Sequence, residues 1–172
     1  MQKVAKFYKV SLEQFIKDWV DTFGDTYNEE DIVKIYDEIK LPKRATKGSA
    51  GYDFYTPIDI MLTPNHTIKI PTGIRCEMEE NWVLKMYPRS GLGFKFRLQL
   101  NNTVGIIDSD YAYSDNEGHI MAKITNDTNE NKNVIVDAGS GFIQGIFVEY
   151  GITTDDDSDG IRNGGFGSTT GK

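Results

Sequence analysis

The first forty residues carry hydrophobic side chains at helical spacing. Apolar positions recur every three or four residues over 11–23, which predicts an amphipathic helix. Ser11 and Gln14 form a capping-box pattern at its start, and Gly24 is a stop signal at its end. A second helix is expected from Asn28, whose side chain can cap it. The apolar positions are Leu12, Phe15, Ile16, Trp19, Val20 and Phe23 in the first helix, and Ile32, Ile35, Tyr36 and Ile39 in the second.

From Leu41 onward the pattern changes to short apolar or alternating runs broken by Gly, Pro, Asn and Asp. Such runs are typical of short strands in a β-sandwich or barrel. They lie at residues 66–78, 81–88, 118–126, 133–139 and 141–150, and a further short strand is expected at 6–10. We therefore expect an all-β domain over residues 1–150, with a helical insertion at about 11–39. Residues 151–172 are expected to form an acidic linker and a flexible Gly-rich arm.

Composition narrows the class of protein. The 172 residues are enough for one domain with a sizeable core, and 38% hydrophobic with 26% charged residues is ordinary for a globular protein. No run approaches about 18 apolar residues and no secretory signal is evident, so we expect no membrane span and a cytoplasmic location. The net charge of −7 disfavours a polynucleotide partner but permits a single nucleotide.

Few side chains are of the kinds that build metal or disulfide sites. Cys76 is the only cysteine, which excludes an internal disulfide and a cysteine-built zinc site. His66 and His119 are far apart in sequence, and we expect surface or turn positions rather than metal ligands. The aspartates within 155–159 could hold a metal ion, but such a run more often solvates a loop.

The candidate chemistry lies in five short segments rich in glycine and polar residues. Asp108 ends an apolar run and is either a turn residue or a general base. Ser90 is a poor candidate nucleophile because no histidine lies near it in sequence. The last segment looks like a phosphate-binding loop but has no helix after it. The five segments are GSAGYDF at 48–54, YPRSGLG at 87–93, NNTVGIIDSDY at 101–111, AGSGFIQG at 138–145 and RNGGFGSTTGK at 162–172.

In order and spacing, these five segments resemble the five motifs of the trimeric deoxyuridine triphosphatase (dUTPase) family. The resemblance covers residues 41–171, and the two-helix addition suggests a phage or bacterial member. It implies a jelly-roll-like β-barrel of the β-clip type and a homotrimer with three active sites at its interfaces. It also implies hydrolysis of dUTP to dUMP and pyrophosphate with Mg²⁺.

The resemblance also implies roles for individual residues. Asp108 matches the general base that activates water for attack on the α-phosphate. The phosphate contacts would come from Ser90, Arg89, Gly91 and Gln144. Asp53 would hold a water of the magnesium ion.

The pyrimidine pocket would be a β-hairpin formed by the third motif. Asn102, Gly105 and Ile107 would contact uracil, and Tyr111 would lie under the deoxyribose, although core packing is the alternative for Tyr111. The C-terminal arm would close as a lid. In that lid Arg162 would reach the γ-phosphate and Phe166 would stack on uracil, with donors and close approach from Gly167, Ser168 and Thr169.

The sequence departs from the family pattern in three places. Gly141 stands where an arginine is usual, residues 112–118 lengthen the segment after Tyr111, and the tail reads GSTTG rather than GSTG. One rival is dCTP deaminase, but Lys123 occupies the place of its essential glutamate. The other rival is a regulatory nucleotide-binding protein that engages a protein partner through the added segments.

Overall fold

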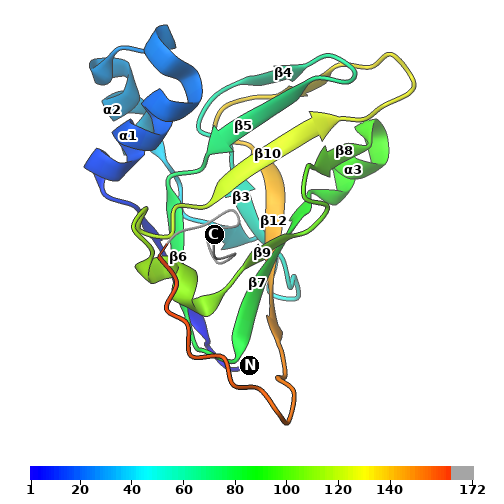
Figure 1. Ribbon diagram of the computed structural model, residues 1–172. Helices are drawn as coiled ribbons and strands as arrows, with labels where there is room; N and C mark the ends of the chain where they lie inside the picture. Colours follow the sequence, from blue (N-terminus) through cyan, green and yellow to red (C-terminus); the bar gives the residue numbers. More distant parts are fainter. Residues whose placement is uncertain (164–172) are drawn as a thin grey trace.

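The computed structural model describes residues 1–163 and is built mainly from antiparallel strands (Figure 1). The strands are β1 (Ala5–Lys9), β2 (Lys43–Arg44), β3 (Tyr52–Tyr55), β4 (Ile60–Leu62), β5 (Thr67–Pro71), β6 (Ile74–Met78), β7 (Trp82–Pro88), β8 (Leu98–Leu100), β9 (Gly105–Ile107), β10 (Met121–Asn126), β11 (Val134–Val136) and β12 (Gly141–Glu149). The helices are α1 (Leu12–Phe23), α2 (Glu29–Glu38) and α3 (Ser90–Phe96), with 3₁₀ turns η1 (Gly24–Thr26) and η2 (Ser109–Tyr113).

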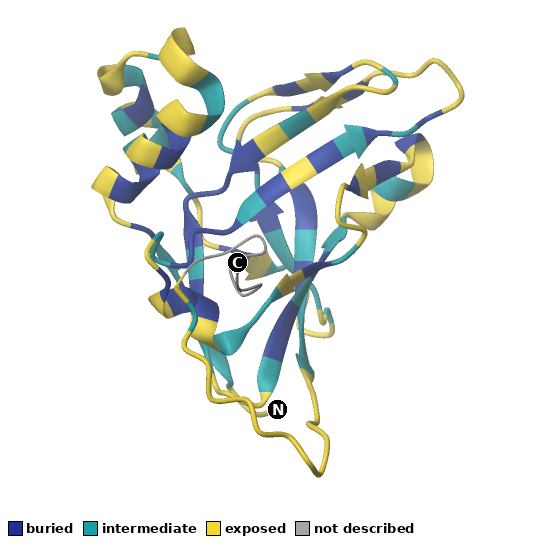
Figure 2. Ribbon diagram, viewed as in Figure 1, coloured by how far each residue is buried: buried dark blue, intermediate teal, exposed yellow. Residues whose placement is uncertain are grey.

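The largest sheet has the strand order β2-β3-β12-β7-β9, and each neighbouring pair is antiparallel. The other described strands pair as β5-β10-β8, β1-β6 and β11-β4. Strand β10 alternates as a half-buried strand should, with Ala122, Ile124 and Asn126 buried and Lys123 exposed. Figure 2 shows buried positions on the long central strands. The expected jelly-roll-like β fold is confirmed.

The predicted helices form with the predicted caps. Ser11 Oγ accepts the backbone N–H of Gln14 at 3.1 Å, and Gly24 ends α1 with φ of +58°. Asn28 caps α2 by accepting the N–H of Asp31 at 2.9 Å. Of the two hydrogen bonds of a capping box, only the one accepted by the Ser11 hydroxyl forms. The side chain of Gln14 turns into the protein instead of returning to Ser11.

The buried face of α1 differs from the predicted one. Phe15 and Trp19 are fully buried, but Leu12 and Val20 are exposed. Two polar residues, Gln14 and Asp18, lie inside in their place. Together with α2 and Val10 the aromatic side chains form a second hydrophobic cluster beside the β body, at one end of the molecule (Figure 1).

The two histidines have different surroundings. His66 is exposed, as expected, but His119 is completely buried, which corrects the expectation for that residue. The acidic stretch 153–160 is exposed throughout. Within residues 1–163 the helices are too short and too polar to cross a membrane.

Candidate active site

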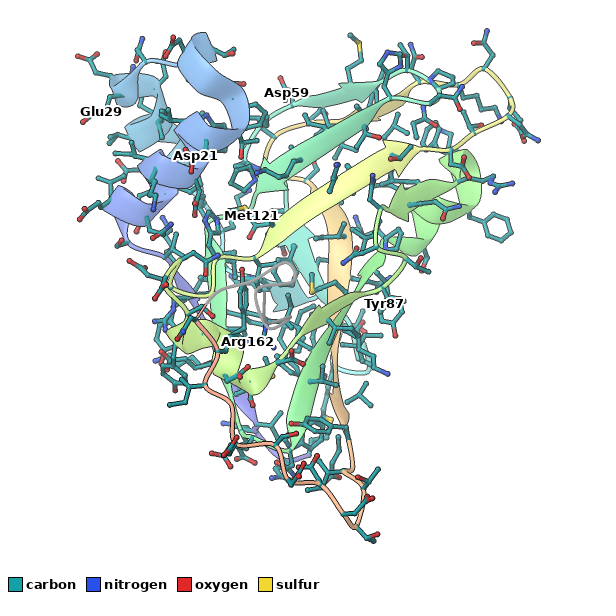
Figure 3. The ribbon with its side chains drawn as sticks, viewed as in Figure 1. Asp21, Glu29, Asp59, Tyr87, Met121 and Arg162 are labelled. Atoms are coloured by element: carbon teal, nitrogen blue, oxygen red, sulfur yellow. The ribbon has the colours of Figure 1, made fainter. Side chains whose placement is uncertain are left out.

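A cavity of about 300 Å³ lies beside β9, and we call it the β9 pocket. It contains six residues that the sequence singled out: Asn102, Gly105, Ile107, Asp108, Tyr111 and Arg162. Figure 3 labels Arg162 close to the η2 segment and Met121 at the start of β10, and both line this pocket. Gly105 lies opposite Met86 on β7, and a Cβ atom at Gly105 would stand 2.9 Å from the Met86 Cβ. A side chain there would push β9 away from the sheet.

The predicted β-hairpin of the third motif is not formed. Strand β9 pairs with β7, whereas the returning strand β10 pairs with β5 and β8. The segment between them turns through η2 and a loop that ends at His119. Because β9 and β10 separate, the backbone between them borders a pocket instead of forming a ladder.

Asp108 stands at the N-terminal end of η2, with its side chain 45% exposed. It is paired with Arg162, whose Nη2 donates to Asp108 Oδ2. Arg162 Nε also donates to Asp110 Oδ1 at 2.8 Å. The sequence suggested that Arg162 reaches the γ-phosphate, but here this guanidinium neutralises two carboxylates of its own chain.

Tyr111 forms part of the pocket wall and is only 4% exposed. Its hydroxyl donates to the carbonyl of His119 at 2.8 Å and accepts from Asn116 Nδ2 at 2.9 Å. Burial raises the pKa of Tyr111, so the hydroxyl stays protonated and keeps donating. The core-packing alternative is confirmed for this residue, which also borders the cavity, and its place under a deoxyribose stays a prediction.

A second cavity of about 440 Å³ gathers the other predicted residues, and we call it the Arg89 pocket. Gln144 on β12 lies opposite Asp53 on β3, so the first and fourth segments meet in the sheet register. Arg89 Nε is 3.1 Å from Asp53 Oδ1, and Gln144 Nε2 donates to the Pro88 carbonyl at 3.1 Å. The candidate residues in this pocket are Asp53, Arg89, Ser90, Gly91 and Gln144.

Two glycines leave room for the polar side chains of the Arg89 pocket. A Cβ at Gly51 would stand 2.5 Å from Gln144 Oε1, and one at Gly141 would stand 3.0 Å from Arg89 Cδ. The guanidinium of Arg89 therefore extends over Gly141, the position that departs from the family pattern. The absence of a side chain at Gly141 lets Arg89 lie there and reach Asp53.

The two pockets have no lining residue in common. The sequence reasoning missed the apolar wall of the β9 pocket, because these residues read as ordinary strand positions. It also missed Asp110 as a partner of Arg162. The residues Phe166, Gly167, Ser168 and Thr169 lie outside the described part of the chain. The missed wall residues are Met86, Leu100, Ile120, Met121, Ala122 and Ile143.

The polar residues of the Arg89 pocket suit a phosphate and the water shell of its cation. In residues 1–163 no three His, Cys, Asp or Glu side chains gather closely enough to hold a bare metal ion. Asp53 is one carboxylate in a pocket with two serine hydroxyls, an amide and a guanidinium. Such a set can accept hydrogen bonds from water bound to an ion and donate them to phosphate oxygens.

Comparison with known proteins agrees with this geometry. A family model described as dUTPase matches residues 37–170. The deoxyuridine 5′-triphosphate nucleotidohydrolase of Lactococcus lactis is 40% identical over 134 residues, covering 76% of this chain and 88% of that relative. The crystal structure of dUTPase from Streptococcus mutans superposes with a TM-score of 0.59 at 32% identity, over 77% of this chain and 95% of that one.

A phage protein shares the fold over more of the chain. The structure of a mutant dUTPase from phage phi11 of S. aureus, which reveals the coordination of a structural Mg(II) ion, covers 92% of this chain and 98% of its own. Its TM-score is 0.61 at 16% identity, which supports the fold alone. The β-clip body with its two pockets, and the relatives named as nucleotidohydrolases, define an all-β nucleotide hydrolase. The chain belongs to the dUTPase family.

Proposed function

We propose that the protein hydrolyses dUTP to dUMP and pyrophosphate, which lowers dUTP and supplies dUMP for thymidylate synthesis. The observation that carries the proposal is the β9 pocket, where the carboxylate of Asp108 borders a cavity of nucleobase size together with Asn102 and Tyr111. Family membership supports the same reaction.

Base selection in this proposal depends on fixed polar groups around uracil. The Asn102 amide and the backbone of Gly105 and Ile107 pair with the base edge. Cytosine would then present an amino group where a carbonyl is needed, and an unpaired buried polar group can lower kcat/KM for the cytosine nucleotide by roughly 10⁴-fold. Tyr111 lies under the deoxyribose, and its ring leaves no room for a ribose 2′-hydroxyl.

Asp108 acts as the general base in the proposed reaction. It holds a water molecule and takes its proton as the oxygen attacks the α-phosphorus, and pyrophosphate leaves. Arg162 donates to Oδ2 of Asp108, and Oδ1 is left to hold the water and accept that proton. A triphosphate offers Arg162 a competing anionic partner of higher charge, which is consistent with its proposed contact to the γ-phosphate.

Phosphate binding falls to the Arg89 pocket. We propose that Ser90, Arg89, Gly91 and Gln144 donate to the α- and β-phosphates, where negative charge moves as the bond breaks. Magnesium bound to the triphosphate would supply charge neutralisation. Asp53 would accept a hydrogen bond from one of its waters.

The separation of the two pockets supports a shared active site. One chain carries Asp108 in one pocket and Ser90 in another, with no lining residue in common. We propose that a homotrimer brings the β9 pocket of one subunit against the Arg89 pocket of its neighbour. The C-terminal arm, with Phe166 on uracil and Gly167, Ser168 and Thr169 at the phosphates, would close over the completed site. A cytoplasmic location and a regulatory partner at the added segments stay predictions.

The proposal is tested by pyrophosphate release from dUTP, dCTP, dTTP and UTP. Wild-type protein should release pyrophosphate strongly from dUTP alone, and Asp108→Asn should lower that rate by about 10²–10⁴-fold, because a neutral amide cannot take the proton. Asp110→Asn is the matched control, since it removes the other Arg162 partner and lies outside the pocket lining. It should keep most of the activity.

Three outcomes would contradict the proposal. Equal release from dUTP and UTP would exclude the assigned sugar contact, and equal release from dUTP and dCTP would exclude the assigned base contacts. Tight dUTP binding without any release would favour the regulatory nucleotide-binding alternative.

A further inference from the structure

Helix α1 carries a carboxylate into the protein interior. Asp18 is 9% exposed and lies on the same face of α1 as the buried Gln14, one turn earlier. Its Oδ2 accepts hydrogen bonds from His119 Nδ1 at 2.6 Å and from Gln14 Nε2 at 2.9 Å. Burial alone would raise the pKa of Asp18, but the hydrogen bonds from His119 and Gln14 outweigh it and lower the pKa below its usual value. The acceptor is therefore ionised at neutral pH.

His119 connects this carboxylate to the pocket wall. Its Nε2 accepts the backbone N–H of Gly73 at 2.7 Å, so the ring is neutral and its Nδ1–H must donate to Asp18. The backbone carbonyl of the same histidine accepts the Tyr111 hydroxyl at 2.8 Å. Asp18 in α1 and Tyr111 in the pocket wall are thus connected by two hydrogen bonds through one residue, His119.

A second contact from α1 holds the same loop. The backbone N–H and the Oγ of Ser11 donate to the two carboxylate oxygens of Glu117, at 2.7 Å and 2.5 Å. Arg75 on β6 donates to the carbonyls of Ala112 and Glu117 at 2.8 Å and 2.9 Å. Residues 109–119, which we call the η2 loop, are therefore fixed on one side by α1 and on another by β6.

We propose that Asp18 is a positioning residue for the nucleotide pocket, setting the place of Tyr111 through His119. The N-terminal helical addition then contributes to substrate selection, in addition to packing against the β body. The proposal depends on the proposed function, because it assumes that Tyr111 contacts the sugar. A purely structural role for Asp18 would affect the stability of α1 but leave nucleotide selection unchanged.

The test compares Asp18→Ala with wild type in dUTP and UTP hydrolysis and in hydrogen–deuterium exchange of the η2 loop. Loss of both hydrogen bonds leaves the buried His119 N–H unpaired and the loop free to shift. We expect KM for dUTP to rise about fivefold to tenfold, with a similar loss of selectivity against UTP. The kcat should change less than twofold, and exchange across residues 111–118 should become faster.

Two variants separate positioning from other effects. Asp18→Asn keeps an oxygen that can accept both hydrogen bonds and should restore most of the selectivity. Asp21→Ala removes an exposed carboxylate from the same helix and should behave as wild type (Figure 3). If Asp18→Ala does not fold, Asp18→Ser replaces it, because its side chain is polar but too short to reach the His119 ring.

A folded Asp18→Ala or Asp18→Ser variant with wild-type KM, selectivity and exchange would overturn the proposal. Wild-type protein that fails to hydrolyse dUTP would contradict the proposed function instead. In that case the exchange rates of the η2 loop alone would decide whether Asp18 positions it.

Discussion

At the scale of single residues, Cys76 shows how burial changes a chemical property. The thiol lies in β6 opposite Phe7 of β1 and is 1% exposed. Burial is the largest cause that raises its pKa, to about 12 from an ordinary value of 9.0, and the charge of Glu77 adds to it. The native thiol therefore stays protonated at pH values where an unfolded chain would lose the proton.

This difference predicts a loss of stability at alkaline pH. The unfolded chain gives up the Cys76 proton above pH 9.0 and the native chain does not, so the free energy of unfolding falls as pH rises. Relative to Cys76→Ala, wild type should lose about 1.4 kcal/mol between pH 8 and pH 10. Urea unfolding of both proteins at several pH values measures this. If the free energy of unfolding depended on pH in the same way for both proteins, the assigned pKa would be wrong.

At the scale of elements, the η2 loop depends on a tight turn at Gly118. This residue has φ of +69°, and a Cβ there would stand 2.6 Å from both the Ala112 Cα and the Tyr111 carbonyl oxygen. Both atoms belong to the backbone and cannot move aside cheaply. The turn returns the chain to His119, so its shape also determines where Tyr111 lies.

Gly118→Ala should therefore lower the free energy of unfolding by at least about 2 kcal/mol. Gly24→Ala is the matched control, because Gly24 has φ of +58° but no atom within 4 Å of the added Cβ. In this control the free energy of unfolding should fall by clearly less. Chemical denaturation measures both variants, and equal losses would mean that the contact with Ala112 and Tyr111 is relieved easily.

The elements were predicted better than the contacts between them. Helical periodicity and caps predicted α1 and α2, because these signals are local. The same periodicity misassigned the inner face of α1, since it counted the exposed Leu12 and Val20 as inner residues and did not include Asp18. Its partner His119 is 101 positions away along the chain, and no local pattern pairs the two.

At the scale of the whole molecule, the order of the five segments predicted the candidate residues but not their division between two pockets. That division depends on the strand order β3-β12-β7-β9, in which the third segment and the fourth segment lie on either side of β7. The pairing of Arg162 with Asp108 was also unpredictable, because it depends on where the tail returns to the body.

The division predicts that two defective subunits can complement each other. Asp108→Asn and Ser90→Ala each damage a different pocket, so a mixed trimer contains some interfaces with both intact residues. After random mixing, about a quarter of the interfaces should be intact, and activity should recover to that fraction of wild type. Each variant is assayed alone and after unfolding and refolding together. Mixed trimers without recovered activity would place both residues in a site within one chain.

The contact between α1 and the η2 loop also imposes an order of events during protein synthesis. Residues 11–23 leave the ribosome well before His119, which lies 101 residues after Asp18. At a synthesis rate of about 5–20 residues per second, the Asp18 carboxylate lacks its His119 hydrogen-bond donor for roughly 5–20 s. The apolar neighbours of Phe15 and Trp19 lie within residues 10–58, so during that interval α1 already has most of its hydrophobic cover. The helical addition is therefore synthesised early, but Asp18 gains its histidine partner only late, when the η2 loop forms the wall of the pocket.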